Sequence, residues 1–309
     1  MAFGSTYLQQ VRALNPESDI PSLAGKVILV TGGNVGLGKQ CVLEFARHSP
    51  SQIWLAARNA ERGQAAVDEI RQKVPNVPIR FLELDLASFD SIKKAAQIVL
   101  TESDRLDILM LNAGVMAVPP GLTKDGYEIE FGTNHMGHAL LTKLLMPLLL
   151  KTTDTGADVR VVSMTSTAFK QAPKDVLDFA RLKSTAEHMS GFERYSQSKL
   201  ANILWARYLA KVYPQLTVAS VHPGLVQTEL MDRASEAPAI MRAFRGVAKM
   251  MAVTVEQGAK NQLWASVSGD VESGEYYEPI GISGQITDNA KDDQLAEKLW
   301  NWTQKELES

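Results

Sequence analysis

Short apolar runs of strand length alternate along the chain with longer stretches of helical periodicity, and no other feature constrains the fold as strongly. The runs are KVILVTG, QIWLAAR, IRFLELD, LDILMLN, DVRVVSM, LTVASVHPG and GEYYEP. Between them, apolar residues recur with a period of about 3.6, in stretches that include 59–74, 88–103, 126–151 and 194–212. Strands that are apolar throughout and separated by helices indicate a parallel sheet covered on both faces. We therefore predict an α/β chain with one doubly wound parallel sheet of seven strands.

The composition is that of an ordinary globular chain, with 309 residues, 45% hydrophobic and 22% charged. This length suffices for a single catalytic domain over 1–309 with its core at 24–285. The net charge of −3 gives no reason to expect nucleic acid or an anionic membrane as a partner. The sequence has one cysteine, Cys41, so an intrachain disulfide cannot form, which fits a reducing compartment.

The most apolar stretch, residues 139–150, is short for a membrane span and contains Lys143 and Pro147. The N-terminal residues show no apolar core of signal-peptide length. We therefore expect no membrane span and a cytoplasmic location.

A glycine-rich turn lies between the first predicted strand and the first predicted helix. In TGGNVGLG, residues 31–38, Gly32, Gly36 and Gly38 let the backbone turn tightly and approach a pyrophosphate at a helix N-terminus. Such a turn alone is equally compatible with a plain tight turn, but its position favours a dinucleotide. The sequence thus predicts a Rossmann-type sheet.

Polar or small residues end the next strands, where a sheet of this type binds its ligands. Arg58 follows the second strand and suits the 2′-phosphate of NADP, whereas an acidic residue would have indicated NAD. Asp85 follows the third strand and is a candidate acceptor for the adenine amine. Asn112, Ala113 and Gly114 end the fourth strand and let the backbone approach the cofactor. The alternatives are a solvated arginine and simple turns, but we predict NADP(H).

Tyr195 and Lys199, in YSQSK, lie four positions apart and share one face if the stretch is helical. A phenol has an ordinary pKa of about 10, and a nearby ammonium lowers it. The pair is therefore a candidate acid or base, although polar neighbours at this spacing are common on helix surfaces.

Together these motifs resemble the classical short-chain dehydrogenase/reductase family, and within it the retinol-dehydrogenase-like branch. The resemblance covers about residues 24–285. Its glycine spacing is that of classical members, since extended members would have glycine where this chain has Val35. The motifs are TGGNVGLG, NAG at 112–114, FGTNHMGHALLT at 131–142, VVSMTS at 161–166, YSQSK at 195–199 and HPGLVQTEL at 222–230.

The resemblance implies a catalytic tetrad of Asn134, Ser166, Tyr195 and Lys199. Tyr195 would exchange a proton with the substrate oxygen, with its pKa lowered by Lys199 together with the positive nicotinamide of the oxidised cofactor. Lys199 would also hold the nicotinamide ribose. Ser166 would bind the substrate oxygen, and Ser163 is the alternative for this role. Asn134 would kink its helix and place a water that relays protons to Lys199; the alternative is a helix-packing amide.

The resemblance also completes the cofactor site. Val226 would direct its backbone toward the carboxamide, and Thr228 would bind the carboxamide or the phosphates. His135 and His138 lack a third ligand nearby and are interpreted as packing or capping residues, so no metal is predicted. The full implied cofactor-binding set is Gly32, Asn34, Gly36, Leu37, Gly38, Arg58, Asp85, Leu86, Asn112, Ala113, Gly114, Tyr195, Lys199, Pro223, Gly224, Val226 and Thr228.

Two segments near the C-terminus bear on substrate and assembly. Residues 229–253 are rich in Met, Ala and Arg, as in a substrate lid with an adaptable apolar pocket, although core packing or a subunit contact would give the same pattern. Residues 291–307 are amphipathic, with Leu295, Leu299 and Trp302 on one side, and predict a helix that docks on the domain or on a partner chain. The resemblance implies a homodimer or homotetramer through paired helices, one of them at 194–212.

The predicted function is that of an NADP(H)-dependent oxidoreductase, a carbonyl reductase of secondary metabolism acting on CH–OH donors. It would interconvert a carbonyl and an alcohol on a small lipophilic substrate by hydride transfer to or from nicotinamide C4. Two alternatives stay open on the same fold. One is a non-redox biosynthetic enzyme such as an epimerase, dehydratase or cyclase. The other is a non-catalytic NADP-binding regulator, against which the intact tetrad argues.

Overall fold

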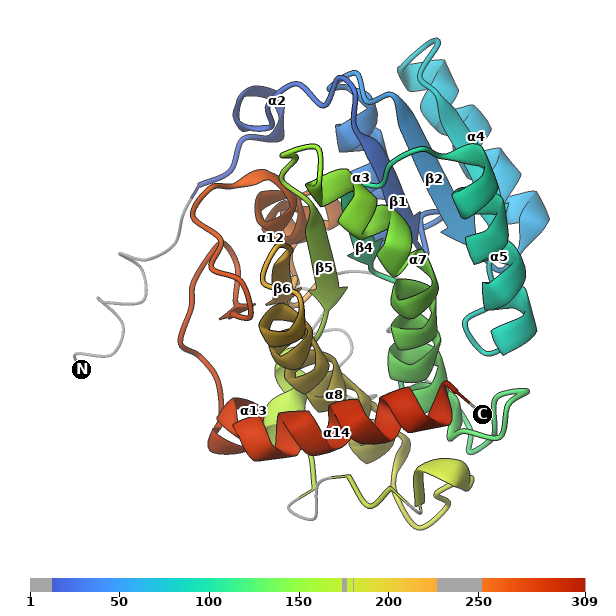
Figure 1. Ribbon diagram of the computed structural model, residues 1–309, viewed down its shortest axis with the longest axis vertical. Helices are drawn as coiled ribbons and strands as arrows, with labels where there is room; N and C mark the ends of the chain where they lie inside the picture. Colours follow the sequence, from blue (N-terminus) through green and yellow to red (C-terminus); the bar gives the residue numbers. More distant parts are fainter. Residues whose placement is uncertain (1–12, 174–176, 180, 227–251, 309) are drawn as a thin grey trace.

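The computed structural model describes residues 13–173, 177–179, 181–226 and 252–308. They form a seven-stranded sheet with the order β3-β2-β1-β4-β5-β6-β7 and with helices on both faces (Figure 1). Every pairing in the sheet is parallel. The predicted fold class is therefore confirmed. The strand order reverses between β1 and β4, the point at which a doubly wound sheet binds its ligands.

The strands and helices follow the periodicity of the sequence. The strands are β1 (Val27–Thr31), β2 (Gln52–Ala57), β3 (Ile79–Glu83), β4 (Ile108–Leu111), β5 (Arg160–Met164), β6 (Thr217–Val221) and β7 (Tyr276–Tyr277). The α-helices are α2 (Pro16–Asp19), α3 (Gly36–Ala46), α4 (Ala60–Lys73), α5 (Phe89–Glu102), α6 (Ile129–Phe131), α7 (Gly137–Thr153), α8 (Gly191–Val212), α12 (Val255–Val267), α13 (Asp288–Lys291) and α14 (Asp293–Glu306). A π-helix, η1 (Gly132–Met136), joins α6 to α7, and two 3-10 helices, η2 (Thr167–Gln171) and η3 (Arg181–Lys183), follow β5.

The core has two layers, one on each face of the sheet. In β1, Leu29 packs into the layer that holds buried residues of α5, α7 and α8, whereas Ile28 and Val30 pack into the layer formed with α3, α4 and α12. Successive side chains of a strand point to opposite faces. Because both faces are covered, the strands need apolar residues at every position, which explains their continuous apolar runs.

Helix α14 lies across α8 in the structure, below the sheet in the view of Figure 1. Arg207 of α8 is 2.9 Å from Asp293 of α14, and Trp205 stacks on Trp300 with ring centroids 6.5 Å apart. Leu299 is fully buried in the same contact. The helix predicted at 291–307 thus docks on its own chain, and it covers part of the helix that the resemblance assigned to subunit pairing.

The apolar stretch at 139–150 forms most of α7, whose side chains are largely buried against the sheet and α5. Among the described residues, no helix combines the length and the apolar character that crossing a membrane requires.

Candidate active site

The N-terminus of α3 faces the glycine-rich turn and has no side-chain cap. The N-cap residue Val35 makes no capping hydrogen bond, and the first N–H groups of a helix have no partner within it. These donors and the positive end of the helix dipole suit an anionic group. Glycine at position 38 lets the turn pass close to α3, since a Cβ there would lie 2.3 Å from the Gly32 carbonyl oxygen. This part of the structure therefore fits the pyrophosphate of a dinucleotide.

We expect Gly38→Ala to lower the affinity for NADPH by at least about 10-fold and stability by about 1–3 kcal/mol, because the added methyl meets backbone that cannot move alone. Fluorescence titration with NADPH and thermal unfolding measure the two effects. Gly269→Ala is the matched control, since no atom lies within 4 Å of its added Cβ. Equal NADPH affinity in the Gly38 variant and the wild type would contradict the close approach at this turn.

Hydrogen bonds that involve side chains connect the ends of β1 and β4. The Asn112 amide donates to the Thr31 carbonyl at 2.9 Å, and the Ala113 N–H donates to the Thr31 hydroxyl at 3.0 Å. Gln262 of α12 donates to the Asn112 side-chain oxygen at 3.3 Å. The predicted residues at this strand end therefore meet the glycine-rich turn, which begins at Thr31, whereas Gln262 carried no recognisable signal in the sequence.

The structure places the remaining predicted cofactor residues along the same edge of the sheet. Arg58 is exposed just beyond β2, and Asp85 is half-buried beyond β3, with one carboxylate oxygen accepting from the Ala87 N–H at 3.1 Å. Leu86 is buried, and Asn34 and Leu37 flank the start of α3. Thr228 and residues 229–251 of the predicted lid lie outside the described residues. Pro223, Gly224 and Val226 follow β6, and Val226 forms a parallel bridge with Val253.

Tyr195 and Lys199 lie one turn apart near the start of α8, which begins with a capping box between Ser190 and Glu193. Each is only 4% exposed. The Lys199 ammonium lies 5.6 Å from the centroid of the Tyr195 ring and donates to the Met164 carbonyl at 3.1 Å. The helix predicted around YSQSK therefore brings phenol and ammonium together in the interior rather than on the surface.

Burial governs the protonation of both groups. It raises the pKa of Tyr195 above its ordinary value, an effect that a hydrogen bond with Ser166 opposes and the charge of Glu130 reinforces. Burial also lowers the pKa of Lys199 to about 8, which the charge of Glu130 opposes. The sequence had predicted a Tyr195 pKa lowered by Lys199. The protein's own groups instead raise this pKa, with burial as the largest cause; the lowering in the presence of a positively charged nicotinamide stays a prediction.

Three hydroxyl residues at the end of β5 were candidates for the substrate-binding serine. Ser163 is buried within the sheet, and the Thr165 hydroxyl donates to the Lys199 carbonyl at 2.8 Å. Ser166 follows the strand, accepts from the Ala168 N–H at 3.2 Å and contacts the Tyr195 hydroxyl. This geometry favours Ser166 over Ser163.

Asn134 lies in the π-helix η1, at the position where the sequence predicts a kink. Its side-chain oxygen accepts from the Val115 N–H at 2.8 Å, and its amide donates at 2.9 Å to both the Val115 carbonyl and the Ser198 hydroxyl. π-Helical turns often occur at functional sites. A Cβ on Gly114 would lie 3.2 Å from the Asn134 oxygen and 3.4 Å from the Lys199 nitrogen, so these groups converge.

His138 connects the π-helix to the end of β1 by hydrogen bonds. Its Nδ1 lies 3.0 Å from the Asn134 carbonyl, and its Nε2 lies 2.9 Å from the Thr31 hydroxyl. A carbonyl only accepts, so Nδ1 carries the hydrogen and Nε2 accepts from Thr31. Burial lowers the pKa of His138 to about 4, so the ring is neutral near pH 7. His135 instead contacts Thr303 of α14 at 3.0 Å, and both histidines serve packing and hydrogen bonding.

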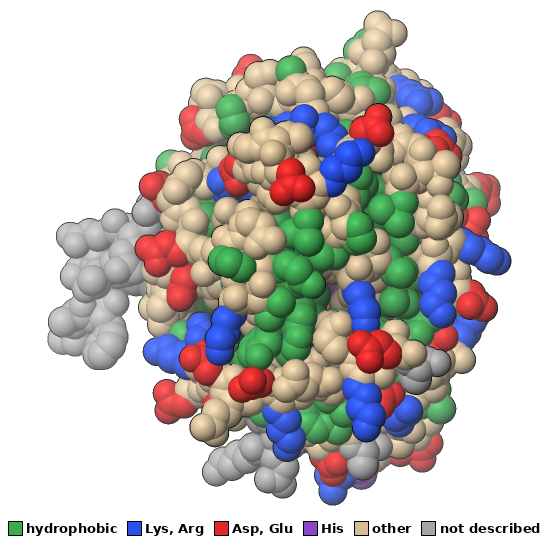
Figure 2. Space-filling view, viewed as in Figure 1, with side chains coloured by type: hydrophobic (Ala, Val, Ile, Leu, Met, Phe, Trp, Pro, Cys, Tyr) green, Lys and Arg blue, Asp and Glu red, His purple; other side chains and the backbone are tan. Residues whose placement is uncertain are grey.

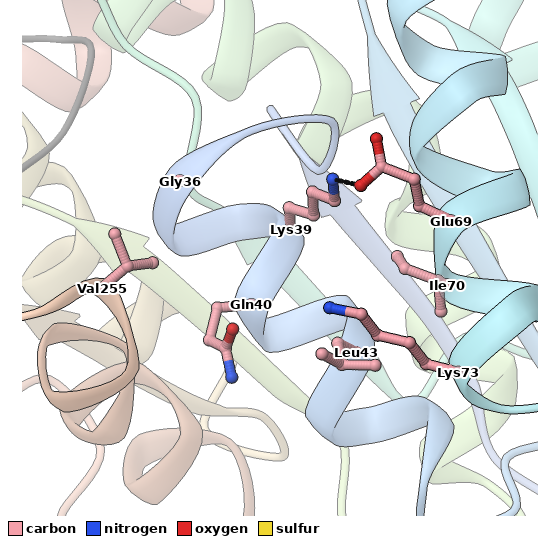
Figure 3. Close-up of a pocket in the computed structure, with 8 residues that line it drawn as sticks. All are labelled: Gly36, Lys39, Gln40, Leu43, Glu69, Ile70, Lys73 and Val255. Atoms are coloured by element: carbon pink, nitrogen blue, oxygen red, sulfur yellow. Dashed lines mark hydrogen bonds and ion pairs between the residues drawn. The ribbon is translucent and has the colours of Figure 1, made fainter.

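A separate pocket of about 190 Å³ lies between α3, α4 and the start of α12 (Figure 3). Lys39 and Glu69 form an ion pair across it. Of the predicted cofactor residues, Gly36 alone lines this pocket, and no member of the tetrad does. It is therefore not the reaction site.

Comparisons with known proteins agree with this geometry. The model of the short chain dehydrogenase family matches residues 26–176. An uncharacterised oxidoreductase of Schizosaccharomyces pombe is 38% identical over 299 residues, which cover 94% of this chain and 87% of that protein. Human retinol dehydrogenase 12 is 35% identical over 283 residues, which cover 90% of this chain and 85% of that protein.

Solved structures share the fold. A crystal structure of a protein from Mycobacterium paratuberculosis matches with a TM-score of 0.73 at 28% identity, covering 95% of this chain and 97% of that chain. A short chain dehydrogenase from Shigella flexneri, complexed with NADP, matches with a TM-score of 0.64 at 21% identity, covering 84% of this chain and 98% of that chain. From the fold, the site geometry and these relatives together, the chain belongs to the short-chain dehydrogenase/reductase family of oxidoreductases.

Proposed function

We propose that the protein interconverts a carbonyl and an alcohol on a small lipophilic substrate, with NADP(H) as the cofactor. The observation that carries this proposal is the buried contact of Tyr195 with Lys199 and Ser166 beyond the carboxyl end of β5. A phenol, an ammonium and a hydroxyl in one buried site are the groups that proton exchange with a substrate oxygen requires.

A nicotinamide held at this site would supply or accept the hydride at its C4. In the direction of reduction, Tyr195 donates its proton to the carbonyl oxygen, and Ser166 donates a hydrogen bond to the same oxygen. Burial raises the pKa of Tyr195, so the phenol keeps its proton near neutral pH until the substrate oxygen receives it. Lys199 holds the ribose hydroxyls and stabilises the phenolate that forms. In the oxidative direction the same groups return the proton.

The choice of NADP(H) rests on Arg58 and on the open N-terminus of α3. Arg58 is exposed beyond β2, where its guanidinium is free to grip a 2′-phosphate. The carboxylate that would instead bind the 2′-hydroxyl of NAD is not at this position. The relative human retinol dehydrogenase 12 supports a lipophilic substrate, because the retinol in its name is a lipophilic alcohol.

Incubation of the purified protein with NADPH and a panel of aldehydes and ketones tests the proposal. We expect loss of NADPH absorbance together with an equal amount of alcohol. Product formed without net change in NADPH would instead identify an epimerase, dehydratase or cyclase. Enhanced NADPH fluorescence without oxidation, across the whole panel, would identify a regulator that binds the cofactor without turnover.

We also propose a homodimer or homotetramer in the cytoplasm. Figure 2 shows hydrophobic side chains gathered in the middle of the face that also carries α14, and such a face suits a second copy of the chain. Because α14 already covers part of α8, subunits would pair beside this helix rather than through the whole of α8. Light scattering after size exclusion measures the assembly, and a fluorescent fusion reports the location.

A further inference from the structure

Two carboxylates and one guanidinium form a cluster inside the protein. Glu128 is 2% exposed, Glu130 is 0% exposed and Arg194 is 1% exposed. The Arg194 Nε atom lies 3.3 Å from a Glu128 oxygen and 3.8 Å from a Glu130 oxygen. Buried charges are costly, and one guanidinium balances only one ionised carboxylate. Stability alone does not account for such an arrangement.

The cluster holds one end of the turn at 115–118. Arg194 donates to the Val118 carbonyl at 2.6 Å, and the Val118 N–H points at a Glu130 oxygen 3.5 Å away. Ala117 within this turn has a φ of 46°, a conformation that a residue with a Cβ rarely adopts. Surrounding contacts must over-determine such a residue for it to persist. The cluster supplies these contacts.

The other end of the turn belongs to the reaction site. Asn134 binds both the N–H and the carbonyl of Val115. Gly114, immediately before the turn, lies against the Asn134 oxygen and the Lys199 nitrogen. Along the chain, Glu130 precedes Asn134 by one helical turn. The turn is thus held by the same two segments that carry the reacting groups.

Arg194 immediately precedes Tyr195 in α8. We propose that Glu130 and Arg194 are positioning residues for this reaction, because they fix the turn at 115–118, whose other end is bound by Asn134 close to the Lys199 ammonium, and because the Glu130 carboxyl is coupled to Lys199 through its charge. This inference rests on the proposed carbonyl–alcohol interconversion.

The charges around Glu130 set the sign of its effect. Glu128 lies on its own segment, Arg194 of α8 lies 3.8 Å away, and the charge of Glu130 acts on Tyr195 and Lys199 of the same helix. Burial raises the pKa of Glu130 to about 8, with Glu128 reinforcing the rise and Arg194 opposing it. When Glu130 is ionised it raises the pKa of both Tyr195 and Lys199, although burial remains the larger cause of each shift. Removing its charge must therefore lower both values.

Glu130→Gln tests the inference, because it keeps the side-chain length and an acceptor for the Val118 N–H while removing the charge. We expect the pH profile of kcat to move about 0.5–1 unit toward lower pH. The Lys199 titration, followed by the Cε chemical shift in protein labelled at the lysine ε-carbon, should move from about 8 in the same direction. A Lys199→Arg sample assigns the signal, and thermal unfolding confirms that the variant is folded.

Glu128→Gln is the matched control. It removes one carboxylate from the same cluster, but Glu128 is not among the groups that shift Tyr195 or Lys199, so the two pH midpoints should move less. A purely structural role would lower the thermal midpoint of both variants and leave the Lys199 titration in place. An unmoved Lys199 titration in folded Glu130→Gln would overturn the proposed charge effect.

Arg194→Lys carries the test independently of Glu130. It keeps the cation but cannot donate to Met189, Val118 and the carboxylates together. We expect kcat to fall about 10-fold or more with a smaller change in the NADPH dissociation constant, because the turn at 115–118, and with it Asn134, is displaced. Wild-type kcat in this variant would refute the positioning role.

If no carbonyl is reduced by the wild type but Lys199 still responds to Glu130→Gln, the proposed function fails and the electrostatic coupling stands.

Discussion

Tyr195→Phe is expected to lower kcat by about 10²- to 10⁴-fold, because the variant keeps the ring but loses the proton that the substrate oxygen receives. The NADPH dissociation constant should stay within about twofold, since the ring still fills its buried position beside Lys199. Steady-state NADPH oxidation with a reactive ketone measures the first quantity, and fluorescence titration with NADPH measures the second.

Tyr208→Phe is the matched control for this experiment. Tyr208 lies in the same helix, and its hydroxyl contacts Glu297 of α14 at 3.2 Å, away from the reaction site. Its variant should turn over like the wild type. Wild-type kcat in Tyr195→Phe would show that another group handles the proton, and the mechanism proposed above would then be wrong.

Arg58→Asp is expected to raise the NADPH dissociation constant by about 100-fold and to improve the binding of NADH. The variant removes a charge-assisted contact to the 2′-phosphate, worth about 1.5–3 kcal/mol for one charged hydrogen bond, and adds a repelling carboxylate. That carboxylate also becomes an acceptor for the 2′-hydroxyl of NADH. Fluorescence titrations with the two cofactors at a fixed salt concentration measure the change in preference.

The control for this variant is Arg181→Asp, the same change of charge on an exposed arginine of η3, outside the predicted cofactor residues. It should leave both dissociation constants unaltered within about twofold, because screening weakens the effect of a distant exposed charge. If Arg58→Asp binds NADPH as tightly as the wild type does, the 2′-phosphate lies elsewhere, and the assignment of NADP(H) loses its main support.

The fold was predictable because its signal is local. Each strand of a parallel sheet covered on both faces must be apolar at successive positions, and VILVT and VVSM display this within a few residues. The intervening helices likewise show their period in their own sequence. The carboxyl ends of parallel strands lie at one edge, so the pattern also predicted that Gly38, Asn112 and Ser166 would gather there, as the structure shows.

The π-helix around Asn134 was only partly predictable. A poor helix former in a helical stretch suggests a kink, but its geometry depends on packing against distant segments. Thr123 packs so close to Gly132 that a Cβ added there would lie 2.3 Å from the Thr123 Cγ2 atom. A Cβ added at Gly137 would likewise lie 2.4 Å from the Leu86 carbonyl oxygen. These close approaches arise from the folded chain and have no counterpart in a local pattern.

By itself, the sequence determined the succession of strands and helices along the chain and the edge of the sheet that carries the glycine-rich turn, because periodicity and motif spacing depend on near neighbours along the chain. The tetrad stays a prediction from the family resemblance. Only the tertiary structure decided the burial of Tyr195, which raises its pKa, and the meeting of Glu128, Glu130 and Arg194. A group's pKa depends on the water it loses and the charges it faces. Both come from segments that are far apart in the sequence and adjacent only after folding.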